Sequence, residues 1–361
     1  QMNAFRVLEW FAASFVLMWG IWAGITRRQT ARIILWSLVL SGSVMGLIAI
    51  LQNLSEADKV LWILKSTNES FWGSFFYRNQ GAAYLNLILI SIGFLYFYHA
   101  KKSQEKAQSG GPHFLLFLLF VLTITSIGMA LSRGGILFGG VLSISFIGGA
   151  ALNALLHSFR VGVSLSVSAL VIVLLGAGAY LLLQQVDLKA IEERFGDVEA
   201  TIENADQDTR ALSSKATWDM AQDNLWLGWG AGSFRYIFPI YQQKYPEIYY
   251  SVNHKRRGWI GRRVYHYAHN DIFQFVAEYG VIGCAFLVAG LCCGMYQVLV
   301  GVEQNFPAAC MIIVGVIAAL GHAFFDFILN NPAYWIAFVG LLTLASRLFS
   351  LTRHYSKQYS S

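Results

Sequence analysis

Nine long apolar stretches constrain what this chain can fold into. They cover approximately residues 7–25, 33–51, 82–98, 114–131, 135–156, 161–183, 281–300, 308–329 and 333–349. A helix needs about 20 apolar residues to cross roughly 30 Å of hydrocarbon, and most of these runs approach that length. Transmembrane strands would alternate apolar and polar residues, and these runs do not alternate. The pattern predicts an all-α polytopic membrane protein with about nine transmembrane helices.

Composition supports this fold class. Hydrophobic residues make up 56% of the chain and charged residues 13%, with a mean hydropathy of +0.50. Soluble domains average about 45–50% apolar residues and roughly 25% charged residues. These values exclude a disordered chain, a disulfide-stapled secreted module and an ordinary cytosolic enzyme. The cysteines lie inside apolar runs without disulfide or metal-ligand spacing, so we expect small buried hydrophobic side chains at Cys284, Cys292, Cys293 and Cys310.

The basic residues behind the net charge of +6 lie in alternate loops. This distribution indicates how the helices are oriented in the membrane and does not favour nucleic-acid binding. They follow the first, third, fifth and ninth runs, at Arg27, Arg28, Arg32, Lys101, Lys102, Lys106, Arg160, Arg353 and Lys357. The positive-inside rule places these loops in the cytoplasm. We therefore predict transmembrane helices 1–6 in residues 1–183, an outward-facing segment in 184–268, and helices 7–9 with a cytoplasmic tail in 269–361. The N-terminus would then lie outside, and no signal peptide is visible, so we expect further spans before residue 1.

The outward segment divides by charge and composition. Acidic residues dominate 187–208, and a basic run between 255 and 263 precedes the return to the membrane. This run either attracts lipid headgroups or diphosphates or forms a solvated face. Helical spacing of apolar residues predicts an amphipathic helix over 211–225. The glycine-rich stretch 227–233 is interpreted as either a tight turn or a phosphate-binding loop. The aromatic stretch 234–250 favours an interfacial belt over sugar stacking.

Two arginines stand at positions suited to anions. Arg133 lies in a very short turn after Ser132, at the edge of two apolar runs. An arginine there requires an anionic partner or a wet cavity, unless its side chain extends to the interface, and guanidinium binds phosphate oxygens in a bidentate manner. Arg210 opens the amphipathic helix, where a surface salt bridge explains it equally well.

A polar stripe leads into the seventh run. His266 and His269 precede Asn270, Gln274 and Glu278, which follow one another at helical spacing on one face. Histidine can accept a proton from a hydroxyl near neutral pH. His322 and Asp326, also four residues apart, favour a structural role in tying helices together.

These short motifs, taken in order, resemble the O-antigen ligase and polymerase family of bacterial envelope glycan assembly. The matching elements are Tyr77-Arg78-Asn79-Gln80, Ser132-Arg133-Gly134, Arg210 with the later Gly228-Trp229-Gly230-Ala231-Gly232, His269-Asn270 with Glu278-Tyr279-Gly280, and His322 with Asp326-Phe327. The chain departs from the family pattern in its N-terminus, which looks truncated, and in the basic 255–263 insert.

The resemblance implies an inverting, metal-independent glycosyltransferase without a cofactor in the bacterial inner membrane, with its active site facing outward. The donor would be a glycan on undecaprenyl diphosphate, and the acceptor a hydroxyl of a glycan, lipid A core or protein. By position, Arg133 and Arg210 would hold the diphosphate and His269 would act on the acceptor. Supporting roles are expected for Ser132, Arg78, Asn79, His266, Asn270, Gln274, Glu278, His322 and Asp326.

Three alternatives remain at this stage. A polymerase of the same family would add the glycan to another lipid-linked repeat. A transporter or flippase would place charged residues and broken helices near the bilayer midplane, often within internal repeats, whereas the candidate residues here collect at helix ends. A structural membrane scaffold leaves the Arg133 turn and the His269 stripe unexplained. Besides its substrates, the protein is expected to contact membrane lipids and no nucleic acid.

Overall fold

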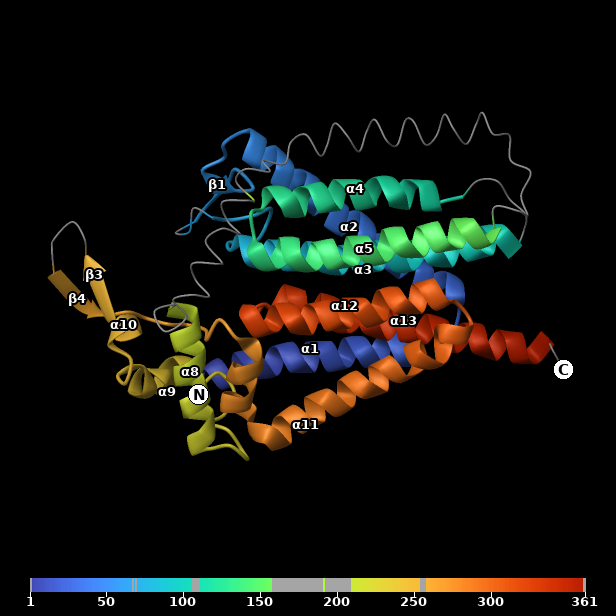
Figure 1. Cartoon of the computed structure of the whole chain (residues 1–361). Coiled ribbons are helices and arrows are strands. Elements are labelled where there is room, and N and C mark those ends of the chain that lie inside the picture. Colours follow the sequence, from blue (N-terminus) through green and yellow to red (C-terminus); the bar gives the residue numbers. More distant parts are fainter. Residues whose placement is uncertain are drawn as a thin grey trace. The chain divides into compact units, whose positions relative to one another are not determined.

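The computed structural model is dominated by long helices (Figure 1). It describes residues 2–66, 68, 70–105, 111–157, 191, 209–253 and 258–359. The long helices are α1 (Met2–Gly24), α2 (Arg28–Leu54), α3 (Arg78–Glu105), α4 (His113–Met129), α5 (Arg133–His157), α8 (Thr209–Asp223), α11 (Asp271–Val300), α12 (Phe306–Phe325) and α13 (Pro332–Tyr359). Shorter elements are the helices α9 (Phe234–Gln242), α10 (Pro246–Tyr249) and η1 (Gly301–Glu303), and the strands β1 (Lys59–Val60), β2 (Leu64–Lys65), β3 (Tyr250–Asn253) and β4 (Gly258–Arg262).

Seven of the described helices are long and apolar enough to cross a membrane. Their spans are Ala4–Gly24, Arg28–Leu54, Arg78–Ser103, Arg133–Ala151, Asp271–Glu303, Phe306–Phe325 and Pro332–Arg353. Each coincides with one predicted run, and the predicted run 114–131 forms the shorter apolar helix α4. The predicted run 161–183 lies outside the described residues. The all-α polytopic membrane fold is confirmed.

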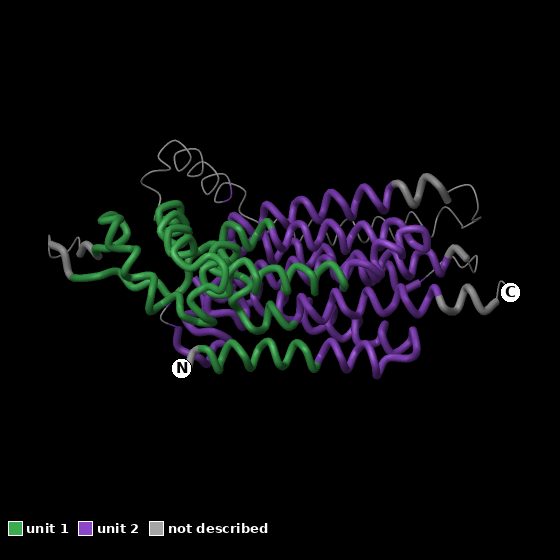
Figure 2. Tube along the Cα trace, turned by 90° about the horizontal axis from the view of Figure 1, so that it is seen from below, with its two compact units in different colours: residues 1–16, 193–293, 321–336 green, residues 17–192, 294–320, 337–361 purple. Residues whose placement is uncertain are grey.

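The chain forms two compact units (Figure 2). Unit 1 comprises residues 1–16, 193–293 and 321–336, and unit 2 comprises residues 17–192, 294–320 and 337–361. The boundary falls inside α1, α11, α12 and α13, so each of these helices contributes residues to both units. Residues 209–253 and 258–268 of the predicted outward segment belong to unit 1.

Unit 2 contains a bundle in which α2, α3, α4 and α5 pack side by side (Figure 1). Small residues let these helices approach closely, as is common in membranes. The hydroxyl of Ser126 on α4 donates a hydrogen bond to the carbonyl of Gly46 on α2, at 3.0 Å. The same hydroxyl accepts a bond from the indole N–H of Trp72, at 3.2 Å. These bonds tie the 72–75 turn to the bundle.

Unit 1 has its own apolar core, built from α8 and α9. Leu212, Ala216 and Met220 form the buried stripe that the sequence predicts for α8, and they share a cluster with Phe234 and Phe238 of α9. The interfacial belt expected over residues 234–250 was therefore wrong for these phenylalanines and for Tyr241. Their spacing places all three side chains on one face of a short helix, and that face covers α8 instead of lipid.

The prediction that the four cysteine side chains are buried was wrong. All four thiols are free, but Cys292 and Cys293 are exposed, and Cys284 and Cys310 are half-buried. They lie on helices whose outer faces are as apolar as the core, because those faces meet hydrocarbon in a membrane. An apolar run alone does not tell these two environments apart.

The basic run between 255 and 263 is described only in part. Strands β3 and β4 form an antiparallel hairpin in which Tyr250 pairs with Arg262. Arg262 and Arg263 are exposed at the end of this hairpin, in agreement with a solvated face. Residues 255–257 lie outside the described residues.

Candidate functional site

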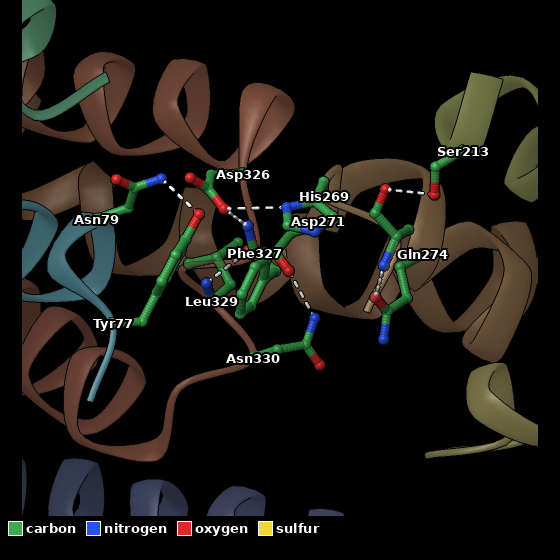
Figure 3. Close-up of polar contacts among 11 residues, drawn as sticks. Tyr77, Asn79, Ser213, His269, Asp271, Gln274, Asp326, Phe327, Leu329 and Asn330 are labelled. Atoms are coloured by element: carbon green, nitrogen blue, oxygen red, sulfur yellow. Dashed lines mark hydrogen bonds and ion pairs between the residues drawn. The ribbon is translucent and has the colours of Figure 1, made fainter. Parts of the chain in front are cut away.

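His269 and Asp326 meet in unit 1, where the chain enters α11. His269 stands just before α11 and Asp326 directly follows α12. The Nδ1 atom of His269 lies 3.6 Å from Oδ1 of Asp326 (Figure 3). The carboxylate is buried, whereas 27% of the histidine side chain is exposed. Nδ1 is a buried ring nitrogen, so the exposed part of the side chain leaves the rest of the ring open to a substrate.

Asp326 is held in its charged form. Burial by itself would raise the pKa of this carboxyl group. The contact with His269 and the positive charge of Arg210 outweigh burial, so the pKa of Asp326 lies below its ordinary value of 3.8. A negative charge therefore faces Nδ1 at neutral pH. The sequence placed Asp326 among the supporting residues and favoured a role in tying helices together, and the structure brings its carboxylate to His269.

The backbone of His269 adopts a left-handed conformation, with φ of 58°. This region is uncommon for residues other than glycine, although histidine visits it more readily than most. Such a conformation costs on the order of 1–3 kcal/mol and persists only where the surroundings enforce it. Residues of this kind cluster at functional sites, which favours His269 over its neighbour His266, an exposed side chain.

Hydrogen bonds fix the backbone on both sides of His269, and Figure 3 shows those of Ser213 and Gln274. The Ser213 hydroxyl of α8 donates to the Ala268 carbonyl at 3.1 Å. The Ala268 N–H donates to Oε1 of Gln274 at 2.9 Å. On the other side, the Asn270 side chain accepts the Phe273 N–H at 3.0 Å and caps α11. These contacts hold the strained backbone in place.

Asp271 joins the start of α11 to the loop between α12 and α13. Its buried carboxylate accepts the Leu329 N–H and the side-chain amide of Asn330, each at 2.5 Å (Figure 3). Its own N–H donates to the Asp326 carbonyl at 3.3 Å. Sequence reasoning missed this residue, although a carboxylate in the first turn of a helix suits the helix dipole. Asp271 thus holds His269 and Asp326 in register.

Glu278, the last residue of the predicted polar stripe, makes hydrogen bonds inside the protein. Its carboxylate accepts the N–H groups of Gly232, at 2.9 Å, and Phe234, at 3.1 Å. The Gln274 side-chain amide donates to the same carboxylate at 3.3 Å. The stripe lies on one helix face as predicted, and its members are buried. It connects the peptide before His269 to the start of α9.

The glycine-rich loop is not a phosphate-binding loop in this structure. Several N–H groups that a phosphate would need already have partners in α11. The Trp229 N–H donates to the Ala277 carbonyl and the Gly230 N–H to the Glu278 carbonyl. Gly228 has a positive φ, and a Cβ there would lie 2.5 Å from Glu278 backbone atoms. The glycines serve close backbone packing, so the tight-turn interpretation holds.

The second cluster lies in unit 2, at the turn between α4 and α5. Leu131 also has a left-handed backbone, with φ of 51°. The buried Ser132 hydroxyl accepts the Gly135 N–H at 3.2 Å and caps α5. Arg133, the first residue of α5, is partly exposed. The turn thus presents an arginine at a helix N-terminus, where the helix dipole also favours an anion.

Arg78 lies at the same end of unit 2 as Arg133. It is the first residue of α3, and α3 and α5 pack together at their first turns. A Cβ at Gly135 would lie only 2.5 Å from that of Ala82, and the Asn86 amide donates to the Gly135 carbonyl at 3.2 Å. Both helix N-termini therefore face the same side. The neighbouring Asn79 amide donates to the Tyr77 hydroxyl at 2.8 Å (Figure 3).

The candidate residues thus form two groups. Unit 1 holds His266, His269, Asn270, Gln274, Glu278, Arg210, His322 and Asp326, and unit 2 holds Arg78, Asn79, Ser132 and Arg133. Arg210 is exposed near the start of α8, and its charge acts on both His322 and Asp326. Within the part of the chain that the structure describes, no group of three or more histidine, cysteine or acidic side chains is arranged to hold a metal ion.

The spans and the two groups of polar residues at helix ends define a multi-pass, all-α membrane protein. Residues 118–288 match the family model described as O-antigen ligase. The match covers just under half of the chain, and over these residues the chain is similar to the O-antigen ligase family. Neither a curated protein nor a solved structure matched the chain.

Proposed function

We propose that this protein is a glycosyltransferase of the bacterial inner membrane. It moves a glycan from undecaprenyl diphosphate to an acceptor hydroxyl on the outer face, without a metal ion and with inversion at the anomeric carbon. The pairing of His269 with Asp326 carries the proposal. A partly exposed histidine with Nδ1 buried against a carboxylate has the arrangement of a general base that accepts a proton on Nε2.

In this reaction, the acceptor hydroxyl gives its proton to Nε2 of His269. Its oxygen bonds to the anomeric carbon from the face opposite the diphosphate. The bond between that carbon and the diphosphate oxygen breaks, and the electron pair leaves with undecaprenyl diphosphate. Asp326 orients the ring and stabilises the imidazolium that forms, because its charge faces Nδ1. A positioned base contributes typically 10²–10⁴-fold to the rate.

Arg133 and Arg210 are assigned to the diphosphate. The leaving group gains negative charge in the transition state, and fixed cations stabilise it most when they are positioned in advance. The first residue of α5 and the N-terminal turn of α8 combine guanidinium charge with a helix N-terminus. Supporting roles fall to Ser132, which caps α5, and to Arg78 at the neighbouring start of α3.

Transfer by the purified full chain in lipid nanodiscs tests the proposal. The substrates are an undecaprenyl-diphosphate-linked glycan and candidate acceptors, with a chelator present, and the readout is release of undecaprenyl diphosphate. We expect His269→Ala and Arg133→Ala to lose about 10²–10⁴-fold in rate. Lys215→Ala, which removes a neighbouring exposed charge on the Arg210 helix, serves as the matched control. Wild-type rates in the folded His269→Ala protein would exclude it as the base.

The product distinguishes the two reactions within the family. One discrete transfer to lipid A core or protein indicates a ligase, whereas a ladder of glycan lengths on undecaprenyl diphosphate indicates a polymerase. We favour the ligase, in keeping with the family description. Loss of release on chelation would contradict the metal-independent mechanism.

A further inference from the structure

Two large apolar side chains are exposed in the loop after α8, within the segment predicted to lie outside the membrane. Trp226 is 67% exposed and Leu227 is 71% exposed. They are consecutive, and neither belongs to the core that α8 and α9 share. Exposed apolar side chains of this size, side by side, mark a surface that contacts something apolar.

The loop is held rigidly against α11. The helix breaks at Gly280, where φ is 65° and ψ is 179°. The break frees the N–H groups of Val281 and Ile282, and the carbonyls of Leu225 and Trp226 accept them at 2.8 and 3.2 Å. The carbonyls of Ala277 and Glu278 in α11 accept the N–H groups of Trp229 and Gly230 in the loop. Trp226 and Leu227 are therefore fixed at the level of residues 281 and 282.

The composition of α11 places that level at an edge of the hydrocarbon layer. From Val281 to Val300, α11 carries no charged residue, and this stretch of about 20 residues matches the thickness of the layer. The face of α11 beyond the break is apolar and exposed, with Phe286 at 75% and Val288 at 57%. If this stretch fills the layer, its first residues lie at one edge, and the attached loop lies there too.

We propose that Trp226 and Leu227 insert into the edge of the bilayer and contact phospholipid acyl chains. The loop is bonded to Val281 and Ile282, which are themselves 40% and 45% exposed at the start of the apolar stretch of α11, and this continuity identifies the occupant as the membrane itself. Tryptophan is enriched at this depth in membrane proteins. The loop thereby fixes the depth of α8 and α9 relative to the bilayer. This inference does not depend on the proposed reaction.

Spin labels at single cysteines test the insertion. Leu227→Cys would be introduced into the full chain after replacing its four native cysteines with alanine, and the labelled protein reconstituted in phosphatidylcholine nanodiscs. Collisions of the label with apolar oxygen and with a polar nickel complex report its depth. Phe286→Cys is the lipid reference, and Gln222→Cys, exposed on α8, is the aqueous reference.

We expect the ratio of oxygen to nickel accessibility at position 227 to exceed that at 222 severalfold and to approach that at 286. A ratio equal to that at 222 would overturn the proposal. If the cysteine-free protein fails to fold, a benzophenone amino acid at position 227 of the native chain replaces the label. Phospholipid adducts at 227 and none at 222 would support insertion. Adducts to a second copy of the chain or to another protein would overturn it.

Discussion

The carboxylate of Glu278 accepts the N–H of Gly232 at 2.9 Å, and so a side chain of α11 fills the anion position ahead of α9. The N-terminus of α9, which could have bound a phosphate, is therefore already occupied by a carboxylate of the same chain. Glycine-rich loops before helices are thus ambiguous until the partner of their N–H groups is known. Here the partner is Glu278, and its hydrogen bonds attach the loop to α11.

Removing this carboxylate should destabilise unit 1. Glu278→Ala removes the carboxylate that accepts the N–H groups of Gly232 and of the buried Phe234, which costs about 1–3 kcal/mol. Unfolding of the variant in mixed micelles would measure the loss. Glu247→Ala, at an exposed position in α10, should stay within about 0.5 kcal/mol of wild type. Equal stability of the two variants would contradict the support assigned to Glu278.

The break in α11 requires glycine at position 280. A Cβ at Gly280 would lie 2.3 Å from the Trp226 carbonyl oxygen, and its backbone conformation is essentially restricted to glycine. Gly280→Ala should lower the free energy of unfolding by more than about 2 kcal/mol. Gly290 lies on the same helix with nothing within 4 Å of such a Cβ, so Gly290→Ala is the control. A folded, wild-type-like yield of Gly280→Ala would show that the break is unnecessary.

Gln274 is expected to act on catalysis through the backbone of His269. Gln274→Ala removes the acceptor of the Ala268 N–H, and relaxation of the strained backbone moves the imidazole. A displacement of about 1 Å can cost 10²-fold in rate. Under the proposed reaction, we expect kcat to fall by about that factor while KM changes little. Gln222→Ala supplies the control, and a variant whose KM alone rises would place Gln274 in substrate binding instead.

The lowered pKa of Asp326 predicts a pH dependence of stability. Because the folded protein holds this group below its ordinary value of 3.8, its charge stabilises the fold above that pH. The contribution disappears as pH falls through the lowered folded value. Asp326→Asn cannot titrate, so its deficit in unfolding temperature relative to wild type should be largest above pH 4 and shrink below it. A deficit independent of pH would mean that the charge contributes nothing.

The membrane helices could be predicted because bilayer thickness fixes their length. The apolar run 82–98 lies inside α3, which begins at Arg78 and ends at Glu105. The helix continues past the hydrocarbon because polar residues at its ends remain hydrogen-bonded in the helix while their side chains reach water. Hydropathy therefore detects the span and underestimates the helix.

The site could be predicted only in part. The spacing of Asn270, Gln274 and Glu278 places them on one face, but it does not say whether that face meets substrate or protein. Glu278 finds Gly232 46 residues away in the sequence, and such long-range pairings leave no local signal. The left-handed backbone of His269 is equally invisible, because neighbours from α8 and α11 enforce it.

The bonds of Asp271 also set an order of events during synthesis. Asp271 and its partner Leu329 are 58 residues apart. At about 5–20 residues per second, a ribosome needs roughly 3–12 s to make the intervening chain. During most of that interval, His269 has been made but Asp326, the carboxylate that faces its ring, has not. Under the proposed reaction, a nascent chain released before Asp326 is made would lack the carboxylate that orients the base, so the order of translation itself would prevent premature transfer.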